Sequence, residues 1–93
     1  MIYFILQRDT GKLKIGYTKT PATLQKRLKT FACGNPEEIE ILHLEPGDRY
    51  REAMIHRQFR QLRIDPKHEW FRYTGNLARY VQKCIETRTE SEF

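Results

Sequence analysis

The feature that most restricts the fold is a pair of short strand-forming runs near the start of the chain, joined by turn residues. The runs read IYFIL and LKIGYT, and the segment RDTGK lies between them. Both runs are rich in β-branched and aromatic residues, which favour strands. Gly11 accepts a positive φ angle without steric cost, so the middle segment suits a tight turn. The sequence therefore predicts a β-hairpin over residues 1–18.

The second run alternates, and the alternation assigns its residues to two faces of the predicted hairpin. Side chains of successive strand residues point to opposite faces. Leu13, Ile15 and Tyr17 therefore share one face, and Lys14 and Gly16 share the other. Each run also carries a tyrosine. Such tyrosines are either ordinary half-buried strand residues or part of a reaction site on one side of the hairpin.

Periodicity and turn residues divide the rest of the chain into further elements. The expected elements are a helix from about Ala22 to Ala32, a strand over 38–44, a helix from about Arg49 to Leu62, a short extended piece over 70–73 and a last helix from Asn76 to about Thr87. The order ββαβαα predicts an α+β fold, in which a small three-stranded antiparallel sheet is flanked by helices. We expect one domain over residues 1–87, followed by a polar tail over residues 88–93.

Capping signals mark where these helices begin. Thr20 followed by Pro21 is typical of a helix start, with proline at the first helical position. Asp48 is expected to cap the second helix and Asn76 the last one. The second helix then buries an apolar stripe on one side. That stripe consists of Ile55, Phe59 and Leu62.

The strand over 38–44 is expected to alternate strictly between its two faces. Alternation places Ile39, Ile41 and His43 on one face, and Leu42 and Leu44 on the other. The sequence shows no partner for His43, so no role is assigned to it.

Charge and composition narrow the classes of partner. The 93 residues are 39% hydrophobic and 31% charged, with a net charge of +5. Excess cationic side chains favour partners that bear phosphate, because binding releases counterions from the polyanion.

No apolar run approaches the roughly 20 residues of a membrane span, and the first residues lack the features of a secretory signal. Cys33 and Cys84 are too few for a disulfide framework and too isolated for a zinc site, so we expect a reducing, cytoplasmic location.

Three residues lie at helix boundaries between core and solvent, where reactive groups are often placed. Arg27 and Glu52 each sit roughly 60° from the apolar stripe of their helix, and His56 shares the side of Glu52. Each also has an ordinary structural explanation. Glu52 and His56 form an i,i+4 pair that is common on helix surfaces, and Arg27 belongs to the basic cluster KRLK, which is typical of a solvated face.

The order of these weak signals resembles the GIY-YIG nuclease superfamily. The segments that carry the resemblance are IYFIL, KIGYT, KRLKTF, CGNPEEIEILH, EAMIHRQF and EWF, which together span residues 1 to about 81. The second half, with E-x-x-x-H-x-x-F and EWF, is similar to the compact branch of viral and bacterial open reading frames in that superfamily. The resemblance implies a metal-dependent endonuclease that hydrolyses DNA phosphodiester bonds with Mg²⁺ or Mn²⁺.

The resemblance also assigns roles to particular residues. Tyr3 matches the tyrosine of the first motif and Gly16 the glycine of the second. Arg27 matches the catalytic arginine and Glu52 the metal-binding glutamate. Accessory catalytic roles fall to Lys14, Tyr17 and His56, and phosphate contacts to Lys12, Lys19, Lys26 and Lys29.

This chain departs from the superfamily pattern at three points. Met1 stands where the first motif has glycine, and Lys14 stands where the second usually has tyrosine. The asparagine that often completes the site has no clear equivalent, and EWF stands near its place. The alternative is therefore a non-catalytic nucleic-acid-binding module on the same fold. Because one small domain offers little surface for reading DNA, we expect a homodimer or a separate DNA-binding partner.

Overall fold

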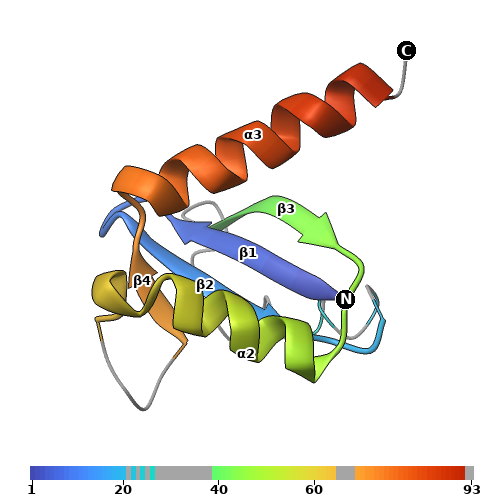
Figure 1. The fold of residues 1–93 in the computed structure, drawn as a ribbon, viewed down its shortest axis with the longest axis horizontal. Coiled ribbons are helices and arrows are strands. Elements are labelled where there is room, and N and C mark those ends of the chain that lie inside the picture. Colours follow the sequence, from blue (N-terminus) through green and yellow to red (C-terminus); the bar gives the residue numbers. More distant parts are fainter. Residues whose placement is uncertain (21, 23, 25, 27–38, 65–68, 92–93) are drawn as a thin grey trace.

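The computed structural model describes residues 1–20, 22, 24, 26, 39–64 and 69–91, with side chains up to residue 87. Within these residues, a four-stranded antiparallel sheet with the order β3-β1-β2-β4 carries two helices on one face (Figure 1). The α+β class and the small sheet flanked by helices are as the sequence predicts. No helix in the described part of the chain is both long and apolar enough to cross a bilayer.

The predicted hairpin is present as β1 (Ile2–Gln7) and β2 (Lys12–Tyr17). Gly11 takes a φ angle of 69° in the connecting turn, which is the left-handed conformation that glycine supplies most readily. Leu13, Ile15 and Tyr17 share the helix-covered face of β2, as their alternation predicts.

Strand β3 (Ile39–Glu45) pairs with β1, but not with the strict alternation that the sequence predicts. The register shifts between Phe4 and Ile5: Phe4 pairs with His43, whereas Ile5 pairs with Ile41. Leu42 is therefore an extra residue, as in a β-bulge. The bulge moves His43 to the helix-covered face, where its ring lies 5.4 Å from that of Phe4. The prediction that His43 shares a face with Ile39 and Ile41 was wrong for this reason, as was the prediction that Leu44 lies on the other face, since Leu44 packs with Ile39 and Ile41.

The piece expected to be extended over 70–73 forms a fourth strand, β4 (Trp70–Arg72), which pairs with the first half of β2. The sheet therefore has one strand more than the three predicted. Arg63 adds an isolated bridge to Phe71, and Phe71 is fully buried. Because β4 is only three residues long, its sequence shows no alternation that would identify it as a strand.

Helix α2 (Arg49–Gln58) begins as predicted, because the Asp48 side chain accepts a hydrogen bond from the Arg51 backbone N–H at 3.0 Å. It ends four residues before the predicted Leu62, and a 3₁₀ turn, η2 (Arg60–Leu62), completes the segment. Ile55 and Phe59 are buried and Leu62 packs against them, so the predicted stripe is confirmed.

Helix α3 (Gly75–Ser91) begins before Asn76 and continues past Thr87. Asn76 is therefore not the capping residue, since the Ala78 N–H already bonds to the Thr74 carbonyl at 3.3 Å. Its buried residues are Leu77 and Val81.

The two faces of the sheet have separate apolar clusters. The larger cluster lies under α2 and α3 and is built on Ile2, Phe4, Leu13, Ile15, Ile55, Phe59, Phe71, Leu77 and Val81. The smaller one, on the opposite face, consists of Tyr3, Ile5 and Leu24. Of the helix predicted from about Ala22 to Ala32, only Ala22, Leu24 and Lys26 are described, and these three are helical. The remainder lies outside the described residues.

Candidate active site

Strand β2 is the element around which the candidate residues are arranged. Tyr3 pairs with Gly16 across the β1–β2 ladder, and its ring lies over the glycine. A Cβ atom at position 16 would approach the Cζ and Oη atoms of Tyr3 to less than 3.0 Å, so only glycine leaves room for this ring. The Tyr3 side chain is 1% exposed. The absence of a side chain at Gly16 therefore fixes where the phenol lies.

Lys14 lies on the same face of the sheet as Tyr3, because its partner in β1 is Ile5. Its Nζ atom is 5.3 Å from the centroid of the Trp70 ring, within the range of a cation–π contact. Trp70 therefore holds the ammonium group of Lys14 at the β2–β4 edge. No local sequence signal indicates this contact, because it depends on the pairing of β4 with β2.

Tyr17 lies on the opposite face from Tyr3, since it pairs with Ile2 and packs against the larger cluster. The guanidinium group of Arg49 lies 5.5 Å from the centroid of its ring. The two tyrosines of the hairpin therefore do not share one face of the sheet. Arg49 is an additional cation at this end of β2, and sequence analysis did not select it.

Helix α2 packs on the helix-covered face of β2 and carries three polar residues of interest, Arg49, Glu52 and His56. His56 donates a hydrogen bond from Nε2 to the Ile15 carbonyl at 2.8 Å, and its ring lies 5.1 Å from that of Phe71. Glu52 lies one turn earlier on the same side of the helix, between His56 and the Arg49 that covers Tyr17, and is half-buried. His56 therefore does not serve only as the surface partner of Glu52. It also joins α2 to β2 through its hydrogen bond to Ile15.

The predicted set is thus distributed over both faces of one strand. Tyr3 and Lys14 lie on the face that also packs Leu24, and Tyr17, Glu52 and His56 lie on the face covered by α2. The predicted Arg27 lies outside the described residues, as does Lys29. The meeting of Tyr3, Arg27 and Glu52 around one ion stays a prediction.

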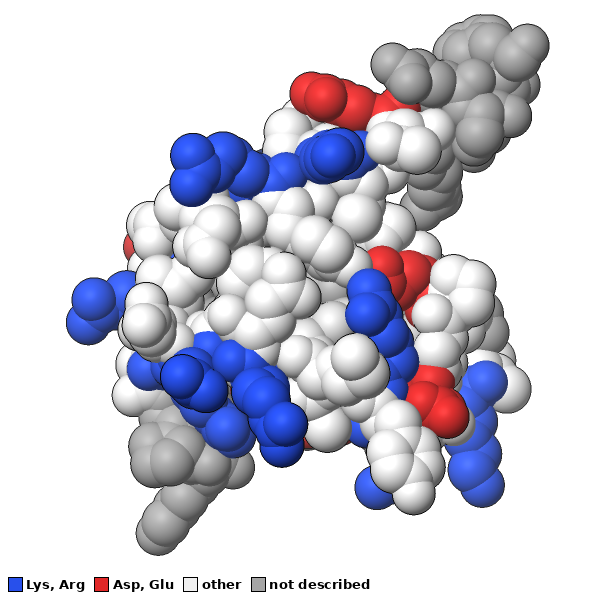
Figure 2. All heavy atoms as spheres, viewed as in Figure 1, with Lys and Arg blue, Asp and Glu red and all other residues white. Residues whose placement is uncertain are grey.

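Basic side chains extend beyond the predicted phosphate contacts. Of the predicted set, Lys19 and Lys26 are exposed and Lys12 is partly exposed. Figure 2 shows further Lys and Arg side chains gathered over the C-terminal half of α2 and the turn that follows it. Exposed arginines of this segment are Arg57, Arg60 and Arg63. The spacing of three residues between these arginines could have identified them from the sequence, because it places side chains close together on helical turns.

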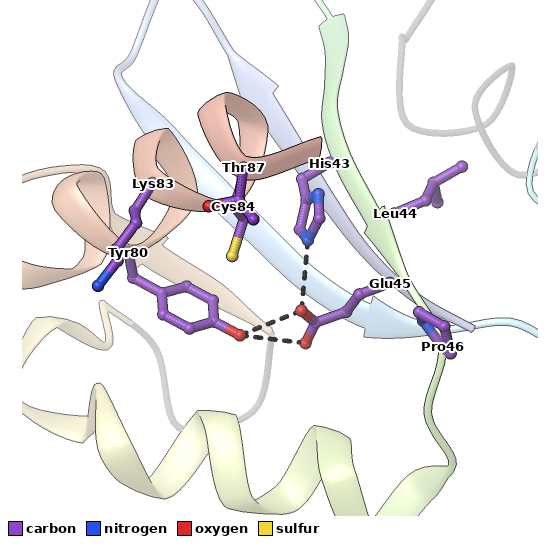
Figure 3. Close-up of a pocket in the computed structure, with 8 residues that line it drawn as sticks. All are labelled: His43, Leu44, Glu45, Pro46, Tyr80, Lys83, Cys84 and Thr87. Carbon is purple, nitrogen blue, oxygen red and sulfur yellow. Dashed lines mark hydrogen bonds and ion pairs between the residues drawn. The ribbon is translucent and has the colours of Figure 1, made fainter. Parts of the chain in front are cut away.

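A second group of polar side chains lies at the other edge of the sheet, between β3 and α3 (Figure 3). The Tyr80 hydroxyl donates to Glu45 Oε2 at 3.1 Å, and the Arg51 Nε atom lies 3.6 Å from Glu45 Oε1. Burial, and then the Glu45 charge, raise the pKa of the Tyr80 hydroxyl to about 12. The same two causes raise the pKa of the Cys84 thiol. Both groups are therefore protonated at neutral pH.

Comparison with known proteins identifies one family. The model of the T5orf172 domain matches residues 1–88, a range that includes every residue predicted for the site. No curated protein and no solved structure matches the chain.

Proposed function

The chain belongs to the T5orf172 domain family, which is associated with nuclease-like proteins, and we propose that it is a GIY-YIG-type endonuclease that cleaves DNA with the help of a divalent metal ion. The family match over residues 1–88 carries the proposal, and two contacts on β2 support it. The phenol of Tyr3 is fixed against Gly16 on β2, and α2, which bears Glu52, is fastened to the adjacent residue of that strand through His56 and Ile15.

The proposed chemistry is hydrolysis of a phosphodiester bond. Tyr3, acting as its phenolate, accepts a proton from the attacking water, and Arg27 neutralises charge on the phosphate oxygens. Lys14 adds positive charge beside the phosphate, since Trp70 holds its ammonium group at the strand edge. His56 is a positioning residue, because its hydrogen bond to Ile15 orients the helix that carries Glu52. For Tyr17, the last residue of β2, we propose a contact with the DNA substrate next to Arg49.

Glu52 is a suitable ligand for Mg²⁺ or Mn²⁺. Carboxylate oxygens are hard donors, and Mg²⁺ in phosphate-processing sites typically takes one or two carboxylates and keeps several waters. Among the described residues Glu52 joins no group of three metal-binding side chains, which agrees with a site completed by water and substrate. The bound ion would polarise the scissile phosphate and stabilise the leaving 3′-oxygen.

DNA is the proposed partner because of the distribution of charge. The exposed Lys19 and Lys26 lie after β2, and Arg57, Arg60 and Arg63 lie along α2, η2 and the residue after η2. Each cation that contacts a phosphate adds to affinity and to its dependence on salt. We propose that a homodimer or a separate DNA-binding partner adds to this small surface.

One observation favours a second candidate, a nucleic-acid-binding module without catalysis. Tyr3 is only 1% exposed, so its hydroxyl reaches substrate only if the groups that cover it move. The basic surface of α2 and η2 does not depend on Tyr3 and would bind DNA in either case.

Incubation with supercoiled plasmid separates the two candidates. The proposal predicts nicked plasmid when Mg²⁺ is present and none when the protein is first treated with EDTA. A binding module would instead retard the DNA in a salt-dependent manner and leave it intact with Mg²⁺ or Mn²⁺. Intact DNA under binding conditions therefore overturns the proposed catalysis, as does nicking that EDTA leaves unchanged.

A further inference from the structure

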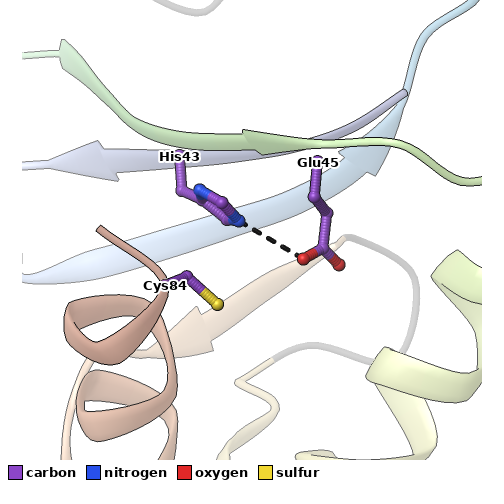
Figure 4. Close-up of side chains that lie close together, drawn as sticks. All are labelled: His43, Glu45 and Cys84. Carbon is purple, nitrogen blue, oxygen red and sulfur yellow. Dashed lines mark hydrogen bonds and ion pairs between the residues drawn. The ribbon is translucent and has the colours of Figure 1, made fainter. Parts of the chain in front are cut away.

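The bulge in β3 creates a compact group of three side chains that is separate from the candidate active site. Because Leu42 is the extra residue, His43 and Glu45 both point from β3 toward α3, and Cys84 points back from α3 (Figure 4). The donor atoms are a histidine nitrogen, a carboxylate oxygen and a thiol sulfur, and all lie within 4.8 Å of one another. Strand β3 forms the edge of the sheet opposite to β4, which carries Trp70.

His43 has an unmet hydrogen-bonding requirement. The residue is 6% exposed, and within the described part of the chain its Nδ1 atom is buried without a hydrogen-bond partner. Its Nε2 atom lies 3.3 Å from Glu45 Oε2, facing the pocket shared with Cys84. An unsatisfied ring nitrogen makes a buried imidazole costly, and Nε2 is the ring nitrogen that faces the Glu45 carboxylate.

We propose that His43, Glu45 and Cys84 bind a divalent transition-metal ion of the Zn²⁺ class. Imidazole nitrogen, carboxylate oxygen and thiolate sulfur are the three donor types that Zn²⁺ takes in proteins. The Cys84 thiol loses its proton to solvent when the ion binds, because metal binding deprotonates a coordinating thiol. Ligands of a tetrahedral ion with bonds of about 2.0–2.3 Å lie roughly 3.3–3.8 Å apart. The 3.3 Å between His43 and Glu45 already meets this spacing. The remaining distances are at most 4.8 Å, so each needs to shorten by no more than about 1–1.5 Å to reach this spacing.

The surroundings of Glu45 suit a metal ligand. Oε1 lies 3.6 Å from the Arg51 Nε atom, and the Tyr80 hydroxyl lies 3.3 Å from Oε1 and 3.1 Å from Oε2. Outer contacts therefore orient the carboxylate, and Oε2 is shared between Tyr80 and His43. The pocket next to the group is open, and it is lined by His43, Glu45, Tyr80, Lys83, Cys84 and Thr87 together with Leu44 and Pro46. A fourth position on the ion is therefore accessible to water or to a small anionic ligand.

The expected consequence is a link between α3 and the edge of the sheet. Cys84 lies in the middle of α3, whereas His43 and Glu45 lie on β3, so the ion joins segments about forty residues apart in the chain. An ion that binds only the folded protein raises the unfolding temperature in proportion to the logarithm of its concentration. Glu52 is not a member of this group.

The test uses the full chain after its metal has been removed with a chelator. Cobalt(II) is added as a spectroscopic substitute for zinc, because a cobalt–thiolate bond gives an intense charge-transfer band in the near ultraviolet. We expect one equivalent of Co²⁺ to produce this band, Zn²⁺ to displace it, and Zn²⁺ to raise the unfolding temperature by several degrees. Absence of the band in the wild-type protein overturns the proposal, and this measurement needs no variant.

Substitutions then identify the ligands. Cys84→Ser is expected to abolish the band and to weaken Zn²⁺ binding at least about 100-fold. The matched control is Cys33→Ser, which removes the other cysteine and should leave both the band and Zn²⁺ binding unchanged. A band that survives in Cys84→Ser, or disappears in Cys33→Ser, assigns the metal to another place and contradicts the proposal. A protein that shows the cobalt band but does not nick plasmid would contradict the proposed nuclease activity and not the proposed metal site.

Discussion

The ring of Tyr3 lies across Gly16 of the neighbouring strand and occupies the space that any side chain at position 16 would need. Because of this contact, the effect of a substitution at position 16 on stability depends on which residue occupies position 3. The ring cannot be displaced by a methyl group without cost, because it is also packed against Ile5 and Leu24 on that face.

Gly16→Ala is therefore expected to destabilise the fold by about 1–3 kcal/mol through overpacking. The background Tyr3→Leu lacks the ring atoms that meet the new methyl group, so the same substitution should cost much less there. Urea unfolding of the wild type, both single variants and the double variant measures this coupling. An equal cost of Gly16→Ala in both backgrounds would show that the contact is not the cause.

Much of the fold follows from local sequence signals, because those signals act within a few residues. The hairpin rests on alternation and on the positive φ angle of Gly11, and the start of α2 rests on the Asp48 cap. The buried stripe that includes Ile55 and Phe59 follows from helical periodicity. These features need no knowledge of what packs against them.

The features that the sequence did not reveal depend on pairing between distant segments. The bulge at Leu42 changes which face His43 occupies, and a pattern of apolar residues contains no sign of an extra residue. The three-residue β4 is too short to show a period, so the contact of Lys14 with Trp70 was not foreseen. For the same reason Cys84 had no visible partner, although Glu45 and His43 lie beside it in space.

His56 is expected to contribute to stability through α2. His56→Ala removes the hydrogen bond to the Ile15 carbonyl and the ring contact with Phe71, and should lower the free energy of unfolding by about 1–3 kcal/mol. The neighbouring exposed Arg57 provides the control, since Arg57→Ala should change it by no more than about 0.5 kcal/mol. Urea unfolding compares the two. Equal effects of the two substitutions would argue against the fastening role of His56.

Lys14 is expected to contact a DNA phosphate next to Trp70, which is the only tryptophan of the chain. Lys14→Met should reduce the slope of log affinity against log salt by about 1, because one phosphate contact is lost. Titration of a short duplex, followed by Trp70 fluorescence at several salt concentrations, measures the slope.

Lys83→Met is the control for Lys14→Met, because Lys83 is an exposed lysine of α3 beside the pocket at the opposite edge of the sheet. We expect it to leave the slope unchanged. A slope that is the same in both variants would place the DNA contact elsewhere.

Glu52 is expected to supply the carboxylate that holds a catalytic metal ion. The most direct test of this role is the single-turnover rate of DNA cleavage at saturating Mg²⁺, compared between the wild type, Glu52→Gln and Glu86→Gln. Glu86 is an exposed glutamate of α3 and serves as the control. We predict that Glu52→Gln reduces the rate by about 10²–10³ while DNA affinity and the circular dichroism spectrum stay unchanged, and that Glu86→Gln cleaves as the wild type does. Undiminished cleavage by a folded Glu52→Gln protein would contradict the account.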